Sequence, residues 1–303
     1  MALISVLWGI ALMSIIAASF LSTGNVSYRL AHNATEIARA DALVDAAVNR
    51  AVLALVDPRP DHRWRVDGTA RSIDLGGAAV RISIQDELGR IDLNHAEGAL
   101  LIGLLRSAGL ETQAASDLTD KMLDWRDANP GKRLNGAKEQ DYRIAGLSQR
   151  PRSGSFQSVD ELKLVMGMTA ELYARIAPAL TVYSGRPLID PQVAPPQALL
   201  ALPTMDAAKV AALISARAES ASAPSGGQGG SPPLTSLQLI GRAFTVHVEF
   251  RKPGLVREPE EDMSASDVVI RLVDDPVRPY WILSRKPADP AAPMGPARDP
   301  IVK

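Results

Sequence analysis

The N-terminal segment constrains this chain most, because it carries no charged side chain before Arg29. Residues 2–21 (ALISVLWGIALMSIIAASFL) are apolar and long enough to cross a bilayer core about 30 Å thick as one helix. Helix-compatible residues continue through 33–56 and stop before Pro58. We therefore expect one long helix, embedded in a membrane along its first part and water-soluble along its second, followed by a soluble body.

A cleaved signal peptide is the alternative interpretation of this segment. It would need basic residues ahead of an apolar run of about 7–15 residues, and a small-residue cleavage site. No Lys or Arg precedes the run, which is longer than that, although Ala17-Ala18-Ser19 resembles a cleavage site. The pattern favours a membrane anchor, and the signal-peptide alternative stays open.

The charge balance and the lack of cysteine restrict the function classes. The 303 residues include 33 Lys and Arg against 34 Asp and Glu, so there is no electrostatic reason to bind nucleic acid. The absence of cysteine excludes disulfides, thiolate metal sites and a cysteine nucleophile. The length outside the apolar segment suffices for two modest cores.

The water-soluble part of the first helix shows one apolar stripe that is rich in alanine. Its residues recur at spacings of three and four. They are Ile37, Ala40, Val44, Ala47, Val48, Ala51 and Leu55. Small side chains let another element approach closely, so we expect a sheet to lie against this stripe.

Strand patterns flank a central helical region. The predicted strands cover residues 63–66, 70–75, 78–86, 244–251, 268–272 and 280–284. The dipeptides Asp67-Gly68 and Gly76-Gly77, which are typical of hairpin turns, separate the first three. His247 occupies a polar position in the alternation of its strand and is expected to face solvent.

Three central segments each predict a short apolar helix, a tight turn and a second apolar helix. They cover residues 100–126, 162–176 and 199–217. Repeated helical hairpins of this kind build a compact all-α domain. Since strands lie on both sides of this region, we infer one sheet over the first helix, with the all-α domain inserted into it.

The predicted division of the chain follows from these patterns. Its parts are the transmembrane part of the first helix (1–28), the soluble helix and first strands (29–94), the inserted α-domain (95–241), the remaining strands (242–285) and a Pro-rich disordered tail (286–303). A Gly-, Ser- and Pro-rich flexible loop is expected at 220–233, inside the α-domain.

Five stretches of the sequence are distinctive: the opening ALISVLWGIAL, IQDELGRIDLN (84–94), LDWRDAN (123–129), NGAKEQDY (135–142) and FQSVDELKLVMGMTAELYARIAPALTVYSG (156–185). The last of them is particularly long. Together they resemble the general secretion pathway protein K family, the minor pseudopilins of type II secretion systems.

This resemblance implies an α+β, pilin-like fold: a long N-terminal helix packed on an antiparallel sheet, with a large helical-hairpin, SAM-like domain inserted. It also implies a single-pass protein of the Gram-negative inner membrane with a periplasmic body and no enzymatic activity. The implied role is at the tip of the pseudopilus, with minor pseudopilins I and J and other pseudopilins as partners. Precursors in this family carry a short basic leader cut by a prepilin peptidase, and the printed sequence shows no such leader.

Ser5 agrees with a tip position. Most pilin-like subunits carry a glutamate at this place, and a carboxylate inside a membrane is tolerated when it pairs with a neighbouring subunit's terminal amine. Ser5 cannot make that ion pair with a subunit ahead of it, and a tip subunit has none ahead. The alternative is that Ser5 is merely a small residue tolerated in a membrane helix.

The segment 124–141 concentrates oxygen ligands suited to Ca²⁺. The candidate ligands are Asp124, Asp127, Asn129, Glu139 and Asp141. The resemblance supports calcium, because some family members bind it in their α-domain, but there a second Asp often stands in place of Asn129 and a Glu in place of Lys138. Lys138 cannot coordinate a cation, although it could replace one electrostatically. The alternative is a solvated loop in which Asp124 or Asp127 pairs with Arg126 or Arg133.

Two other function classes find little support. Helix-hairpin-helix modules that bind DNA use glycine-rich turns whose N–H groups meet phosphate, whereas the turns at Gly109 and Gly167 lack a second glycine and the turn at Pro203 has none. No H-E-x-x-H, G-x-S-x-G or phosphate-binding G-x-x-x-x-G-K-[ST] motif is present. A membrane-tethered periplasmic protein-binding or hydrolytic domain is the remaining alternative.

Overall fold

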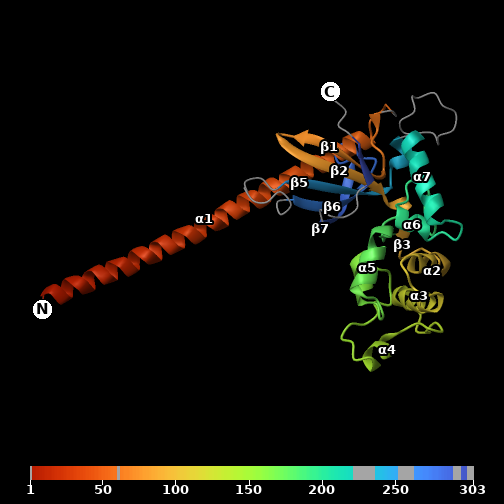
Figure 1. Cartoon of the computed structure of the whole chain (residues 1–303), viewed down its shortest axis with the longest axis horizontal. Coiled ribbons are helices and arrows are strands. Elements are labelled where there is room, and N and C mark those ends of the chain that lie inside the picture. Colours follow the sequence, from red (N-terminus) through yellow and green to blue (C-terminus); the bar gives the residue numbers. More distant parts are fainter. Residues whose placement is uncertain (1, 60–61, 221–235, 252–262, 289–294, 299–303) are drawn as a thin grey trace.

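The computed structural model describes residues 2–59, 62–220, 236–251, 263–288 and 295–298. Within these ranges, the backbone alone is described at residues 2, 15–27, 29, 220, 236–237 and 295–298. Figure 1 shows a single long helix, α1 (Ala2–Leu55), that projects from a sheet, while shorter helices gather beyond the sheet, away from the free end of α1.

The predicted membrane span coincides with the first part of α1. Among the residues that are described, no helix combines the length and the apolar character required to cross a membrane. Residues 15–21 of the predicted span lie outside those whose side chains are described.

The main sheet has six strands in the order β7-β6-β5-β2-β1-β8. These strands are β1 (Asp67–Leu75), β2 (Ala78–Asp86), β5 (Ala243–Arg251), β6 (Met263–Leu272), β7 (Tyr280–Ala288) and β8 (Gly295–Arg298). Neighbours pair antiparallel, except that β8 runs parallel to β1. Because β2 and β5 are adjacent although distant in sequence, everything between them leaves the sheet and returns to it.

The intervening chain is called the helical block below. Its elements are η2 (Glu87–Gly89), β3 (Ile91–Asp92), α2 (Gly98–Ser107), α3 (Thr112–Arg126), α4 (Glu139–Ile144), η3 (Val159–Leu164), α5 (Ala170–Ile176), η4 (Ala177–Ala179), β4 (Leu180–Thr181), α6 (Pro196–Leu200), α7 (Ala207–Ser220) and α8 (Ser236–Leu239). The three predicted hairpins correspond to α2–α3, η3–α5 and α6–α7. The block is not all-α as expected, since β3 and β4 pair in parallel.

Buried apolar side chains among the described residues form two separate clusters. In one, the stripe of α1 from Val44 to Leu55 packs against inward-facing residues of β2, β5 and β6, such as Ile82 and Val246. The other fills the helical block and includes Leu104 and Trp125. The expected contact between the stripe and a sheet is confirmed, although Ile37, at the start of the stripe, is exposed.

Several strand predictions need correction. Residues 63–66 form no strand, because Trp64 turns into the α1 cluster and lies under the guanidinium groups of Arg50 and Arg71. Asp67-Gly68 is not a hairpin turn but an irregular start of β1, with Gly68 at φ +82°. The Gly76-Gly77 turn is confirmed, and both glycines have positive φ, as a type I′ turn requires.

The prediction of a disordered tail over 286–303 is wrong where the tail is described. Residues 286–288 continue β7 alongside β6, and 295–298 form β8 beside β1. The loop predicted at 220–233 lies outside the described residues, apart from Ser220 at the end of α7. Strand pairing supplies the backbone hydrogen bonds that a Pro-rich composition alone does not predict.

Candidate functional site: the 124–141 loop and the Asp92 junction

The five predicted ligands lie on the end of α3, the loop after it and α4. Trp125 is buried between the rings of Tyr142 and Phe156, with centroids 6.0 and 6.1 Å away, and fixes the end of α3 against α4. Asp124 is fully buried, whereas Asp127 and Asp141 are partly exposed and Glu139 is largely exposed. The structure therefore separates one buried carboxylate from three that water reaches.

Both carboxylate oxygens of Asp124 bond to Arg133. Its Oδ1 accepts a hydrogen bond from Nη1 of Arg133 at 2.7 Å, and its Oδ2 accepts one from the backbone N–H of Arg133 at 3.2 Å. The chain at Gly136 packs directly on this carboxylate, where a Cβ would lie 1.8 Å from Oδ2. The interpretation that Asp124 pairs with Arg133 agrees with these contacts.

The exposed ligand candidates are also paired. Oδ1 of Asp127 accepts hydrogen bonds from the backbone and side-chain amides of Asn129, which lower the pKa of Asp127. Asp141 accepts from Nζ of Lys132 at 2.8 Å and from the backbone N–H of Lys138, and these bonds lower its pKa. Glu139 faces Arg150 at 3.2 Å. Each carboxylate therefore already faces a donor from the chain.

Lys138 lies just before α4 and reaches back to the end of α3. Its Nζ donates to the backbone carbonyl oxygens of Asp124 and Asp127, at 2.9 and 2.8 Å. Carbonyl oxygens of this kind are among the ligands that Ca²⁺ uses. Among the described residues, no three His, Asp or Glu side chains come together as a metal site would need. In this arrangement the five candidates do not fit a calcium ion, and the calcium site stays a prediction.

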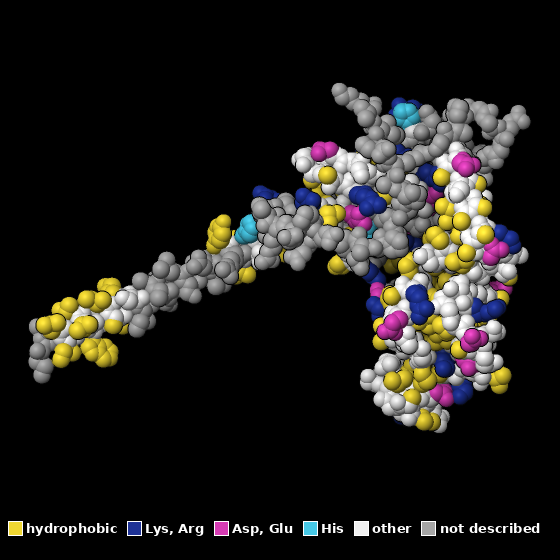
Figure 2. All heavy atoms as spheres, in the orientation of Figure 1, with side chains coloured by type: hydrophobic (Ala, Val, Ile, Leu, Met, Phe, Trp, Pro, Cys, Tyr) yellow, Lys and Arg dark blue, Asp and Glu magenta, His cyan; other side chains and the backbone are white. Residues whose placement is uncertain are grey.

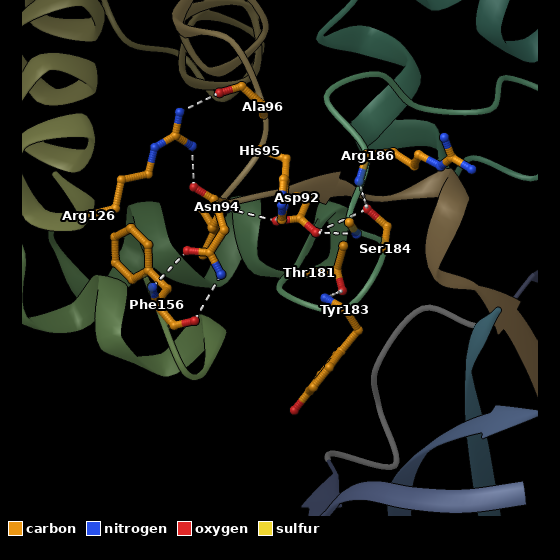
Figure 3. Close-up of polar contacts among 12 residues, drawn as sticks. Asp92, Asn94, His95, Ala96, Arg126, Phe156, Thr181, Tyr183, Ser184 and Arg186 are labelled. Atoms are coloured by element: carbon orange, nitrogen blue, oxygen red, sulfur yellow. Dashed lines mark hydrogen bonds and ion pairs between the residues drawn. The ribbon is translucent and has the colours of Figure 1, made fainter. Parts of the chain in front are cut away.

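A second polar cluster, which the sequence analysis missed, surrounds Asp92 at the end of β3 (Figure 3). Oδ1 of the buried Asp92 accepts from the backbone N–H of Asn94 at 2.8 Å and lies 3.1 Å from Nδ1 of His95. Its Oδ2 accepts from Ser184 and from the backbone N–H of Gly185, at 3.2 and 2.8 Å. Asp92 therefore joins the β3–α2 turn to the chain after β4.

The neighbouring Asn94 and Arg126 extend this junction to the helices (Figure 3). The amide of Asn94 makes two hydrogen bonds with the backbone of Phe156, at 2.7 and 2.9 Å. Arg126 donates to the carbonyl oxygens of Leu93 and Ala96. These contacts hold the turn in place. The sequence feature that could have indicated this junction is IDLN (91–94), which lies in one of the stretches that resemble the protein K family.

His247 does not face solvent as expected. It is 9% exposed, and its ring nitrogens lie 2.6 Å from Asp267 and 3.3 Å from Glu249. Burial alone lowers the pKa of His247, but the bonds and charges of the two carboxylates outweigh it and raise the pKa above 6.5. The prediction failed because β5 is central and buried on both faces, so alternation does not mark a solvent face.

In comparisons with known proteins, the segment that contains both polar clusters matches a family model. Residues 83–185 match the family model described as Type II secretion system (T2SS), protein K. Type II secretion system protein K of Pseudomonas aeruginosa is 26% identical over 204 residues, which make up 58% of this chain and 60% of that protein. The protein K of Klebsiella pneumoniae is 36% identical over 75 residues, 25% of this chain and 23% of that protein.

A solved structure shares the fold. One chain of the GspK-GspI-GspJ complex from the enterotoxigenic Escherichia coli type 2 secretion system superposes with a TM-score of 0.58 and 15% identity. The match covers 85% of this chain and 99% of that chain. The predicted resemblance to the protein K family is confirmed, and the chain spans about three fifths of the Pseudomonas relative's length.

Proposed function

From the match of residues 83–185 to the type II secretion protein K family model, we propose that the chain is a minor pseudopilin. In this role it sits at the tip of the pseudopilus and initiates or caps the fibre together with minor pseudopilins I and J. The match of residues 83–185, which run from the end of β2 to just beyond β4, carries the proposal. The fold shared with a chain of the GspK-GspI-GspJ complex supports it.

The role requires an N-terminal helix that resides in the inner membrane before assembly and packs against other pseudopilin helices afterwards. Figure 2 shows hydrophobic side chains gathered on the free end of α1, where Leu3, Trp8 and Met13 are each more than 70% exposed. The small residues Gly9 and Ala11 allow close helix approach. Exposed apolar surface of this kind is favourable only against lipid or protein.

The shape supports a terminal position in the fibre. The helical block widens the molecule at the end opposite the free part of α1 (Figure 1), and a bulky end would block addition of a further subunit there. Ser5 supports the same position, because it has no carboxylate that could pair with the terminal amine of a subunit ahead of it. The role is structural, and we assign no catalytic residues.

Co-purification tests the proposal. The tagged full chain is produced in its host and extracted from membranes in detergent, and its complex with minor pseudopilins I and J is analysed by mass determination. An equimolar complex of the three subunits is expected. A chain that is folded, as shown by a cooperative thermal transition, but that recovers neither partner would contradict the proposal and favour a tethered periplasmic domain of another class.

A further inference from the structure

In the 124–141 loop, a positively charged side chain contacts backbone carbonyl oxygens at the end of α3. The ammonium group of Lys138 donates to two carbonyl oxygens that belong to the last turn of α3 and the residue after it, those of Asp124 and Asp127. We propose that Lys138, with Arg133, acts as a built-in cation, so that this loop folds without calcium. This inference concerns the chain alone and does not depend on the proposed tip function.

The charges around Lys138 support this assignment. The C-terminus of a helix carries a partial negative charge, which a nearby cation stabilises. The buried Asp124 carboxylate adds a full negative charge at the same end of α3, and Arg133 binds it directly. Lysine is a compact point charge with three donors, so its ammonium group can bind several carbonyl oxygens as a small cation does.

The packing leaves the buried carboxylate inaccessible to an added ion. Its Oδ1 holds Arg133, and its Oδ2 lies against the backbone of Gly136. To reach the carboxylate, a calcium ion would have to displace Arg133, the backbone at Gly136 and the ammonium group of Lys138. Among the described residues, the other acidic candidates face Lys132, Arg133 or Arg150 rather than one common point.

The experiment compares Lys138→Met with Lys132→Met in the full chain. Both replacements remove one charge from the same loop, but within the described part of the chain Lys132 pairs with the partly exposed Asp141 alone. Surface pairs of this kind contribute little. Thermal unfolding is followed with a chelator and with calcium at about 1 mM, the upper end of the range for extracellular calcium modules. Calcium binding to the parent chain is measured by calorimetry.

The parent chain is expected to show the same Tm with chelator and with calcium, and to release no binding heat. Lys138→Met should lower Tm by at least about 4 °C in both conditions, because it leaves the carbonyl oxygens without their charged donor. Lys132→Met should shift Tm by less than about 2 °C.

Two outcomes would overturn the proposal. A calcium-dependent rise in the Tm of the parent chain, with measurable binding heat, would show that the predicted ion site exists beside Lys138. Equal Tm values for Lys138→Met and the parent chain would show that the ammonium group does not hold the loop. The first outcome is read from the parent chain, so it remains decisive even if a variant fails to fold.

Discussion

At the scale of single residues, Gly136 has no room for a side chain in the 124–141 loop. Gly136→Ala would place a Cβ 1.8 Å from Oδ2 of Asp124, a fully buried side chain held by Arg133. Overpacking of this kind costs about 1–3 kcal/mol. Gly131→Ala is the matched control, because a Cβ there meets nothing within 4 Å, and it should stay within about 0.5 kcal/mol. Urea unfolding measures both, and equal midpoints for the two variants would refute the expected clash.

A second prediction at this scale concerns pH. Because the folded state raises the pKa of His247 above 6.5, its pairs with Asp267 and Glu249 stabilise the protein at low pH, and this stabilisation is lost as pH rises through the raised pKa. Arg81 also contacts Glu249 at 3.3 Å. His247→Gln should therefore flatten the decrease in unfolding free energy between mildly acidic and alkaline pH. The exposed His32→Gln control should leave the parent profile unchanged, and an equally steep decrease in His247→Gln would contradict the assignment.

At the scale of elements, the helical block depends on short helices with few caps. Thr169 is the N-cap residue before α5, and its side chain accepts a hydrogen bond from the backbone N–H of Leu172 at 3.2 Å. Thr169→Ala should cost about 1 kcal/mol, as the loss of an N-cap usually does. Ser158 stands at the same position before η3 without a side-chain cap bond, so Ser158→Ala should be nearly neutral in denaturant unfolding. A neutral Thr169→Ala would show that tertiary packing alone holds α5.

Some of the helices and strands can be predicted from the sequence, and others cannot. The long helix, the three helical hairpins and most strands of the main sheet follow local periodicity, which the sequence displays directly. The strand β8 does not, because Gly295–Arg298 owes its form to pairing with β1. The six-residue α4 is likewise too short for a periodic signal, and Tyr142, fully buried, holds it in place.

The candidate site also has features that the sequence shows and features that it does not. The crowding of acidic residues in the 124–141 loop was visible in the sequence, and so was the presence of Lys138 among them. The sequence did not show where the side chains of Arg133 and Lys138 point, because this depends on how the loop folds back on the end of α3. The Asp92 junction joins residues 92 and 185 through a single carboxylate. A local sequence pattern does not predict a contact between residues so far apart in the chain.

At the scale of the whole molecule, the two separate cores predict two units of unfolding. The helical block and the sheet contact each other through polar bonds, such as that from Gln85 to the carbonyl oxygen of Val193 at 2.7 Å, and through Leu239 of α8, which packs in the cluster under the sheet. Apart from Leu239, the two buried apolar clusters are distinct. Regions with their own core open as separate cooperative units. Leu104→Ala, which removes a buried side chain from the helical block at a cost of about 2–5 kcal/mol, should accelerate amide exchange in α2, α3 and α6 while β2 and β5 stay protected.

The reciprocal variant is Val246→Ala, which removes a buried side chain from the cluster under the sheet. It should accelerate exchange in β2, β5 and β6 and leave the helical block protected, as hydrogen exchange with mass spectrometry can measure for each peptide. If either variant accelerates exchange equally in both regions, the polar contacts couple them into one cooperative unit. In that case the helical block could not open independently of the sheet, and the boundary predicted near residue 95 would separate two regions of structure without separating two units of stability.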